Sequence, residues 1–463
     1  MHKMFFKMVL VFLIAFVSAF LGRRIGLNEQ QALSLGVFMC SVCGTLFFWE
    51  FRLSFAFLGI STLVLTKTID IEHLIKFSSL EVILFLVGMM VVVAVMKESG
   101  FFAWIVELIL RMENLTARKF VLVISLVSAI LSATTGEVIS IIFMVAAIFE
   151  ICDYFEVDSL PYIIISVFAT NIGSAATVLG NPIGILIATK AGLTGEDFMI
   201  KALPLSLLCL FAMIGVVMVW YRKSLNEFDK KIKELGANEI LIRLITVPIG
   251  KELRTALWIF AVSVVLISAS HRFEVLFGLE NNSVLLTIPL IMAAIIMIWK
   301  HEKARDFIEK DVEWWSLLFF MLLFAQAGTL KFTGATDVFA QRLTELAGGN
   351  REILLGLILW VSSIGSSIMD NVVIVVAFIP IIHGFGDTVK NLEVFWWALL
   401  FGGCLGGNIT LVGSTANIIA AGLFEKEKRK KIGFGRWLGV GLVIGFLTTA
   451  IIWAALLVLP VHR

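Results

Sequence analysis

Two acidic residues lie within long apolar stretches, where a charged group is costly and usually has a function. Glu137 ends the run Ser-Ala-Thr-Thr-Gly-Glu, and Asp370 precedes Asn371 in Ser-Ser-Ile-Met-Asp-Asn. A carboxyl group at membrane depth keeps its proton unless a cation or hydrogen-bond donors compensate its charge. Glu137 and Asp370 are therefore candidate proton or Na⁺ sites, with Asn371 as a further Na⁺ ligand. The alternative for each acid is a structural hydrogen bond to backbone opened at a turn.

Amide and hydroxyl side chains in the same regions offer further ligands. An amide both donates and accepts, whereas a hydroxyl either binds a ligand or bonds back to its own helical turn. Asn171 is equally well explained by helix packing, because it aligns with Cys404 in the duplication described below. The polar candidates are Thr134, Thr135, Thr177, Asn181, Ser366, Ser367, Asn371, Asn408, Thr410, Ser414 and Asn417.

Two stretches rich in Gly, Asn and Pro interrupt apolar runs that would otherwise continue as helices, at 173–182 and 406–417. Glycine costs a helix interior about 1 kcal/mol, and proline removes a backbone donor. Irregular backbone survives at membrane depth only where it is buried in protein or lines a cavity. We therefore expect broken helices that unwind at Gly180 and Gly413, with amides and carbonyls free to hold a ligand.

Four apolar regions are too long for one simple span each. The regions 160–190 and 394–424 contain the predicted breaks. The other two, 120–149 and 352–383, consist of an apolar leg, a polar tip and a second apolar leg. This pattern predicts re-entrant hairpins whose tips carry the two acids near the middle of the membrane.

The composition is that of an all-α polytopic membrane protein. Of the 463 residues, 59% are hydrophobic and 16% are charged, whereas soluble proteins carry about 25% charged residues. Long apolar runs recur from end to end. The net charge of +2 gives no reason to expect a nucleic-acid partner. We expect the lipid bilayer and a small ion as partners, and no cofactor beyond a coupling Na⁺ or H⁺.

The two halves of the sequence match at a nearly constant offset, which indicates an internal duplication. The matched pairs, 232 to 234 residues apart, are Glu81 and Glu313, Gly100 and Gly334, Ser132 and Ser366, and Gly180 and Gly413. The predicted organisation is an extra N-terminal helix at 1–30, repeat 1 at 31–221, a cytoplasmic linker at 222–255 and repeat 2 at 256–463.

Lys and Arg placement predicts the topology. The segments 222–255 and 425–436 are rich in both residues and should be cytoplasmic, as should the N-terminus. The counterpart of 425–436 in repeat 1 is 190–201, which one helix separates from the linker, so it should lie outside. The repeats are therefore expected to be inverted. This scheme places Arg23 and Arg24 outside, which conflicts with the rule that Lys and Arg are enriched on the cytoplasmic side.

The run 405–417, together with 77–81, 88–90, 99–102 and 171–182, resembles the ion transporter superfamily with its citrate-transporter-like domain. The nearest branch holds arsenite efflux pumps, NhaD-type Na⁺/H⁺ antiporters and the P protein. The resemblance implies about eleven membrane-spanning units, two opposed hairpins, one broken helix per repeat, elevator-type alternating access and a homodimer in the cell (inner) membrane.

The sequence departs from this family at the first tip and the first break. The family tip ends in Asp-Asn, as at 370–371, but the first tip reads Gly136-Glu137. The family break reads Gly-Asp-Pro-Pro-Asn, whereas Asn181 and Gly184 stand here at the Asp and Asn positions. Whether Glu137 replaces the missing acid is left open.

These features predict a secondary active transporter coupled to H⁺ or Na⁺ that moves a small inorganic ion, by Na⁺/H⁺ exchange or by extrusion of an arsenite-like oxyanion. A coupled transporter of citrate or dicarboxylates is the alternative, although no Lys or Arg lies within either tip or break. An ion channel is the alternative class. An enzyme is not expected, because no His-Glu-x-x-His motif or nucleophile with a nearby base is found.

Overall fold

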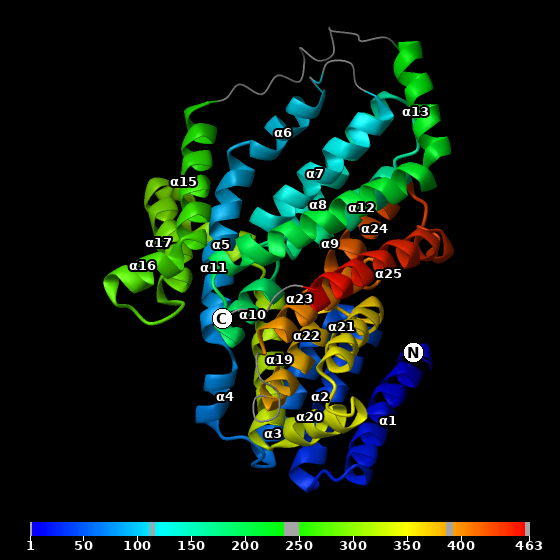
Figure 1. Ribbon diagram of the computed structural model, residues 1–463. Coiled ribbons are helices and arrows are strands. Elements are labelled where there is room, and N and C mark those ends of the chain that lie inside the picture. The colour runs from blue at the N-terminus through cyan, green and yellow to red at the C-terminus, as the bar shows by residue number, and fades with distance from the viewer. Residues whose placement is uncertain (1, 111, 113–115, 236–249, 386–391, 459–463) are drawn as a thin grey trace. The chain divides into compact units, whose positions relative to one another are not determined.

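The computed structural model describes residues 2–110, 112, 116–235, 250–385 and 392–458, and the regular elements in these ranges are helices (Figure 1). Residues 236–249 of the predicted linker lie outside the described residues. In the described part, 8 helices are long and apolar enough to cross a membrane, or up to 10 if each of two bent pairs is one span. The all-α membrane architecture is confirmed, and the expected eleven units stay a prediction.

The chain divides into two compact units that do not follow the two repeats. Unit 1 comprises 1–83, 313–403 and 453–463, and unit 2 comprises 84–312 and 404–452. Each unit therefore combines segments from both halves of the sequence. The repeat and linker boundaries predicted from the duplication stay a prediction.

Unit 1 is organised around α19, which packs against α2, α3, α4, α20 and α22. Gln326 of α19 donates to the Ala56 carbonyl of α3 at 3.0 Å. Gly59 permits this approach, because a Cβ there would stand 2.8 Å from the Gln326 amide nitrogen. The helices of unit 1 are α1 (His2–Arg24), α2 (Glu29–Phe47), the short η1 (Trp49–Phe51), α3 (Arg52–Leu65), α4 (Ile71–Phe77), α19 (Trp314–Phe332), α20 (Ala335–Leu346), α21 (Arg351–Ile368), α22 (Asn371–Gly384) and most of α23 (Glu393–Gly406).

Unit 2 is built around α9, which packs against α7, α8, α12 and α24. All residues of α9 are buried, as expected for a helix that is apolar on every side. The longer helices of unit 2 are α5 (Leu80–Glu98), α6 (Phe101–Leu110), α7 (Ala117–Thr135), α8 (Glu137–Tyr154), α9 (Leu160–Ser174), α10 (Pro182–Ala191), α12 (Leu203–Trp220), α13 (Arg222–Leu235), α15 (Lys251–Ser268), α16 (Ser270–Phe277), α17 (Ser283–Trp299), α24 (Thr415–Lys428) and α25 (Phe434–Val458).

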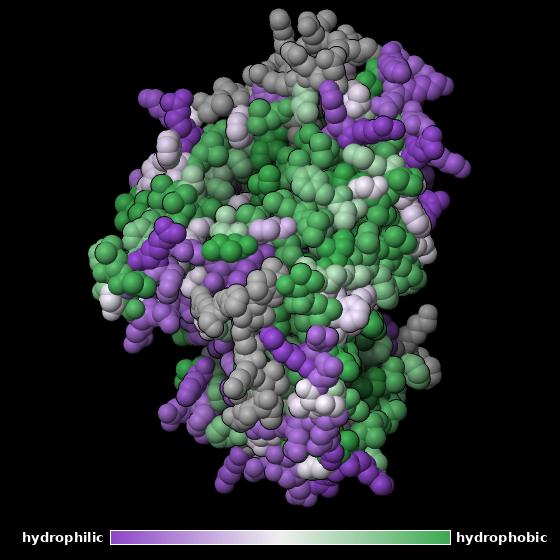
Figure 2. Space-filling view, viewed as in Figure 1, coloured by the Kyte–Doolittle hydropathy of each residue, from purple (hydrophilic) through white to green (hydrophobic). Residues whose placement is uncertain are grey.

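Large apolar side chains cover much of the molecular surface. Leu65, Val219 and Ile298 are 82%, 77% and 77% exposed. On the face shown in Figure 2, apolar residues cover the sides of helices, and hydrophilic residues gather at helix ends and around α13. Such a surface is stable in contact with lipid tails rather than water.

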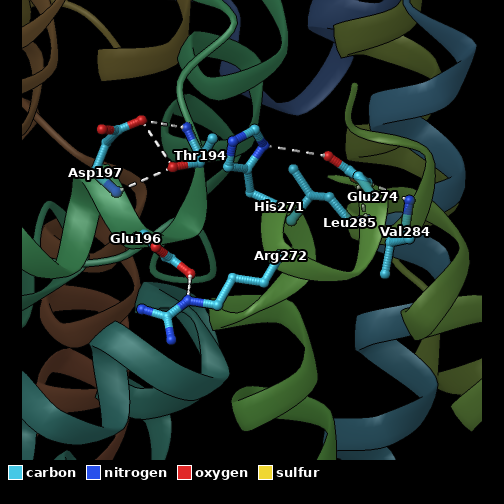
Figure 3. A network of polar contacts seen from close by, with 8 residues as sticks. All are labelled: Thr194, Glu196, Asp197, His271, Arg272, Glu274, Val284 and Leu285. Carbon is cyan, nitrogen blue, oxygen red and sulfur yellow. Dashed lines mark hydrogen bonds and ion pairs between the residues drawn. The ribbon is translucent and has the colours of Figure 1, made fainter. Parts of the chain in front are cut away.

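A polar network in unit 2 joins the short helix α11 (Gly195–Asp197) to the start of α16 and α17 (Figure 3). Arg272 pairs with Glu196, with Nε and Oε1 2.6 Å apart. The buried Glu274 accepts from the first amides of α17, those of Val284 at 3.0 Å and Leu285 at 3.4 Å. The chain before α12 and the chain between α15 and α17 therefore contact each other within unit 2.

Candidate functional site

The first predicted hairpin is present as α7 and α8, joined at Gly136 (Figure 1). Ser140 donates to the Ser128 carbonyl at 3.2 Å, so the helices fold back on each other. Gly136 has φ +89° and ψ 153°, a conformation almost restricted to glycine. The family Asp would be strained at this position, which gives a physical reason for the departure at the first tip. That the hairpin re-enters the membrane stays a prediction.

The second hairpin is formed by α21 and α22. A Cβ on Gly365 would stand 2.7 Å from the Ile374 side chain, so the two legs pack closely. Asp370 caps α22, because its Oδ1 accepts from the Val372 amide at 3.0 Å. Asp370 and Asn371 are 3% and 1% exposed. The second tip therefore buries a carboxyl group at a helix N-terminus, where negative charge is favoured.

Hydroxyl groups at the two tips bond mainly within their own helices. Thr134 and Thr135 each donate to the carbonyl four residues earlier at 2.8 Å, and Ser367 to the carbonyl three residues earlier at 2.6 Å. Ser366 instead donates to Gly403 of α23. Thr134, Thr135 and Ser367 therefore bond back to their own helices, which is the alternative noted from the sequence. Their oxygen atoms can still accept a hydrogen bond from a ligand.

The first broken helix is confirmed: α9 ends at Ser174 and α10 begins at Pro182. Asn181 caps α10 by accepting from the Gly184 amide at 2.9 Å. A Cβ on Gly180 would stand 2.2 Å from the Ser174 carbonyl oxygen, so the return of the chain at this point requires glycine.

The first tip and the first break are in direct contact within unit 2. The Glu137 amide donates to the Gly180 carbonyl at 3.1 Å. The Thr177 hydroxyl donates to the Ala133 carbonyl of α7. Glu137 is 4% exposed. The structure therefore brings Glu137, Thr177 and Gly180 together, and their role as a binding site stays a prediction.

The second break, between α23 and α24, repeats two backbone-amide hydrogen bonds of the first. Thr177 and Thr410 each accept on Oγ1 from the amide two residues later, at 3.1 and 3.2 Å. Their carbonyls accept from Gly180 and Gly413, at 3.4 and 3.3 Å. Residues 233 positions apart thus make the same hydrogen bonds, as expected for duplicated segments.

Each break also contacts the other repeat through the residue that caps its second helix. Asn181 donates to the Cys404 sulfur at 3.1 Å. Ser414 caps α24 and donates to Asn171 Oδ1 at 3.0 Å. Asn181 aligns with Ser414 and Asn171 with Cys404, so the two contacts are counterparts.

Three buried asparagines form a cluster at the second break. Asn171 donates to the side-chain oxygens of Asn408 and Asn417, both at 2.9 Å. Asn417 donates to the Gly407 and Thr410 carbonyls at 2.7 and 2.8 Å. Asn171, for which packing was an equal alternative, thus lies at the centre of the cluster. Its sequence neighbours gave no signal, because its partners come from the other half of the chain.

One donor of this cluster is unused. Asn408 is fully buried, and its Nδ2 has no hydrogen-bond partner in the part of the chain that the structure describes. A buried donor without a partner costs about 1–3 kcal/mol. Asn408 Nδ2 is therefore a ready contact for an acceptor atom of a ligand.

The candidate residues are divided between the two units. Unit 2 holds Thr134, Thr135, Glu137, Thr177, Gly180, Asn181, Asn408, Thr410, Gly413, Ser414 and Asn417, and unit 1 holds Ser366, Ser367, Asp370 and Asn371. That the two acids serve one ligand stays a prediction.

Comparison with known proteins identifies relatives over most of the chain. A family model described as "Citrate transporter" matches residues 45–402. An uncharacterized transporter of Mycobacterium tuberculosis is 31% identical over 79% of this chain and 82% of its own length. The human P protein is 26% identical over 77% of this chain and 51% of its own length. The crystal structure of the YdaH transporter of Alcanivorax borkumensis shares the fold, with a TM-score of 0.55 and 16% identity over 86% of this chain and 88% of that one.

Proposed function

Because this chain belongs to the citrate transporter family of secondary transporters, we propose that it couples H⁺ or Na⁺ to the movement of a small inorganic ion. The cargo would be Na⁺ exchanged for H⁺, or an arsenite-like oxyanion that is extruded. Elevator-type alternating access, a homodimeric assembly, residence in the cell membrane and a cytoplasmic N-terminus and linker belong to the same proposal.

The observation that carries the proposal is the burial of a carboxyl group at each hairpin tip. Glu137 is the first residue of α8, and Asp370 caps α22. A buried carboxyl group favours its proton, whereas a helix N-terminus favours its charge. A carboxyl group under both influences can exchange a proton for a cation, and this is the step that coupling requires.

A second candidate function is the transport of citrate or a dicarboxylate. The description of the matching family model favours it. The unused Asn408 Nδ2 also suits a ligand rich in acceptor oxygens. In this reading the coupling cation binds at the acids, and amide groups of the breaks contact the carboxylate.

Flux measurements in proteoliposomes test the proposal. The purified protein is reconstituted with a pH-sensitive dye inside, and gradients of Na⁺, Li⁺, K⁺, arsenite, citrate and dicarboxylates are applied in turn. We expect one of these gradients to drive proton movement, or an imposed pH gradient to drive uptake of one species. A unitary current far above about 10⁴ ions per second would indicate a channel, because each transport cycle includes a μs–ms conformational step.

Asp370→Asn is the decisive variant, with Asp337→Asn on the surface of α20 as its control. Asparagine keeps an acceptor for the Val372 amide but cannot release a proton. We expect Asp370→Asn to fold and to lose coupled flux, and Asp337→Asn to behave as wild type. Unchanged coupled flux in Asp370→Asn would falsify the assigned role.

A further inference from the structure

Arg52, the first residue of α3, is a charged side chain buried in unit 1. It is 3% exposed. Its guanidinium carbon lies 4.0 Å from the ring centroid of Trp49 and 4.8 Å from that of Phe319. Its Nη2 donates to the Ser316 hydroxyl at 3.1 Å. The aromatic rings and the hydroxyl hold the guanidinium plane in one orientation inside the protein.

Most of the hydrogen-bonding capacity of Arg52 is unused. A guanidinium carries five N–H groups and stays charged at any physiological pH. Nε and Nη1 are buried, and neither has a hydrogen-bond partner among the described residues. Burying a charged donor without an acceptor is unfavourable. The arrangement therefore points to an acceptor that the described residues do not supply.

Arg52 and the second tip belong to the same unit, and both contact α19. The carboxyl groups of Asp370 and Glu313 are close enough to Arg52 to act on its charge. Ser316 and Phe319 lie on α19, which also packs against α22, the helix that Asp370 caps. These acids offset part of the cost of burying the guanidinium, but they leave Nε and Nη1 unbonded.

We propose that Arg52 binds the anionic oxygens of a carboxylate or an inorganic oxyanion through Nε and Nη1, next to the tip that carries Asp370. A fixed guanidinium matches two oxygens of such an anion at once, and a lysine ammonium does not. The inference rests on the transport function proposed above and assigns its anion-recognition residue. Arg52 lies outside both tips and both breaks in the sequence.

Anion binding by the full-length protein in nanodiscs tests this inference. Acetate and citrate serve as carboxylate probes, phosphate and arsenate as oxyanion probes and chloride as an anion without oxygen, at constant ionic strength. Binding is measured by isothermal titration calorimetry for wild type, Arg52→Lys, Arg52→Gln and Arg342→Gln, which removes an exposed arginine of the same unit. The two groups of probes distinguish a carboxylate ligand from an inorganic one.

We expect wild type and Arg342→Gln to bind one oxygen-bearing class with the same Kd and chloride weakly or not at all. Arg52→Lys should raise that Kd about tenfold or more, and Arg52→Gln should abolish binding. Equal Kd values in wild type and Arg52→Lys overturn the inference, even if Arg52→Gln does not fold. Absence of binding to wild type up to about 10 mM anion also overturns it.

The measurement uses no ion gradient, so it is independent of coupling. If wild type binds an anion through Arg52 but shows no H⁺- or Na⁺-coupled flux, the coupling proposal fails and the anion site stands. If coupled flux depends on Asp370 but no anion binds, the anion site fails and the coupling proposal stands.

Discussion

The Ser414 hydroxyl lies 3.0 Å from Asn171 Oδ1, within donating distance, and this contact joins the second broken helix of the chain to the first. In its counterpart, Asn181 of the first broken helix donates to the Cys404 sulfur of the second. The residue that caps the second half of each broken helix thus contacts the first half of the other broken helix. Both contacts lie inside unit 2, so the two breaks form one structural element there.

Asn171→Ala should strongly destabilise the protein. It removes both hydrogen bonds donated by Asn171 and leaves the buried Asn408 Oδ1 without this donor, whereas Ser414 and Asn417 can still bond to each other at 2.9 Å. A buried group without its partner costs about 1–3 kcal/mol, so the loss should be about 1–3 kcal/mol. Thermal unfolding of the detergent-solubilised protein measures it. The exposed Asn281→Ala is the control, and an equal melting temperature for both variants would contradict the central place of Asn171.

Gly180→Ala should prevent correct folding of the first break. The added Cβ would stand 2.2 Å from the Ser174 carbonyl oxygen, and a backbone atom at that distance cannot move aside without displacing α9. Gly215→Ala is the matched control, because nothing lies within 4 Å of a Cβ there and the residue is within α12. The control should be neutral or gain up to about 1 kcal/mol from helix propensity. Size-exclusion profiles and melting temperatures compare the two, and a wild-type profile for Gly180→Ala would refute the geometry of the break.

Two of the three acids shown in Figure 3, Glu274 and Glu196, should differ in their contribution to stability. Glu274 is buried and accepts from two amides at the start of α17, whereas Glu196 makes an ion pair with an exposed Arg272. Glu274→Ala should cost about 1.5–3 kcal/mol, and Glu196→Ala less than about 1 kcal/mol. Melting temperatures in low and in high salt check this, because only the exposed pair should be screened. A larger loss for Glu196→Ala would reverse the assignment.

Glu137→Gln should change how transport depends on pH. Glutamine resembles the protonated acid and cannot titrate, so any step that requires the release of this proton is lost. The flux–pH profile in proteoliposomes should flatten or shift, while Glu150→Gln, an exposed position on the same helix, should leave it unchanged. Superimposable profiles for Glu137→Gln and wild type would remove Glu137 from the coupling step.

The local features of this fold were predictable, and the contacts between distant segments were not. Gly180, Asn181 and Pro182 in an apolar run predict the first break, because each is unfavourable inside a helix. The turn at Gly136 follows from similar reasoning. Both are properties of a few neighbouring residues, which a sequence displays directly.

Asn171 and Arg52 depend instead on partners far away in the chain. Asn171 meets Asn408, 237 residues later, and Arg52 meets Ser316, 264 residues later. The tip hydroxyls were ambiguous for another reason: a buried Thr or Ser satisfies its hydrogen equally well on a ligand or on its own helix. Thr134, Thr135 and Ser367 bond to their own helices, and the sequence could not decide between the two.

The exchange of capping contacts between the repeats has a consequence for the evolution of the chain. An ancestral half-length polypeptide could bury the same amides and hydroxyls only against a second copy of itself. Asn171 and Ser414 differ from their counterparts, Cys404 and Asn181, so each contact fits the partner that it has in the present chain. Neither half could then return to independent existence without exposing unbonded polar groups to lipid.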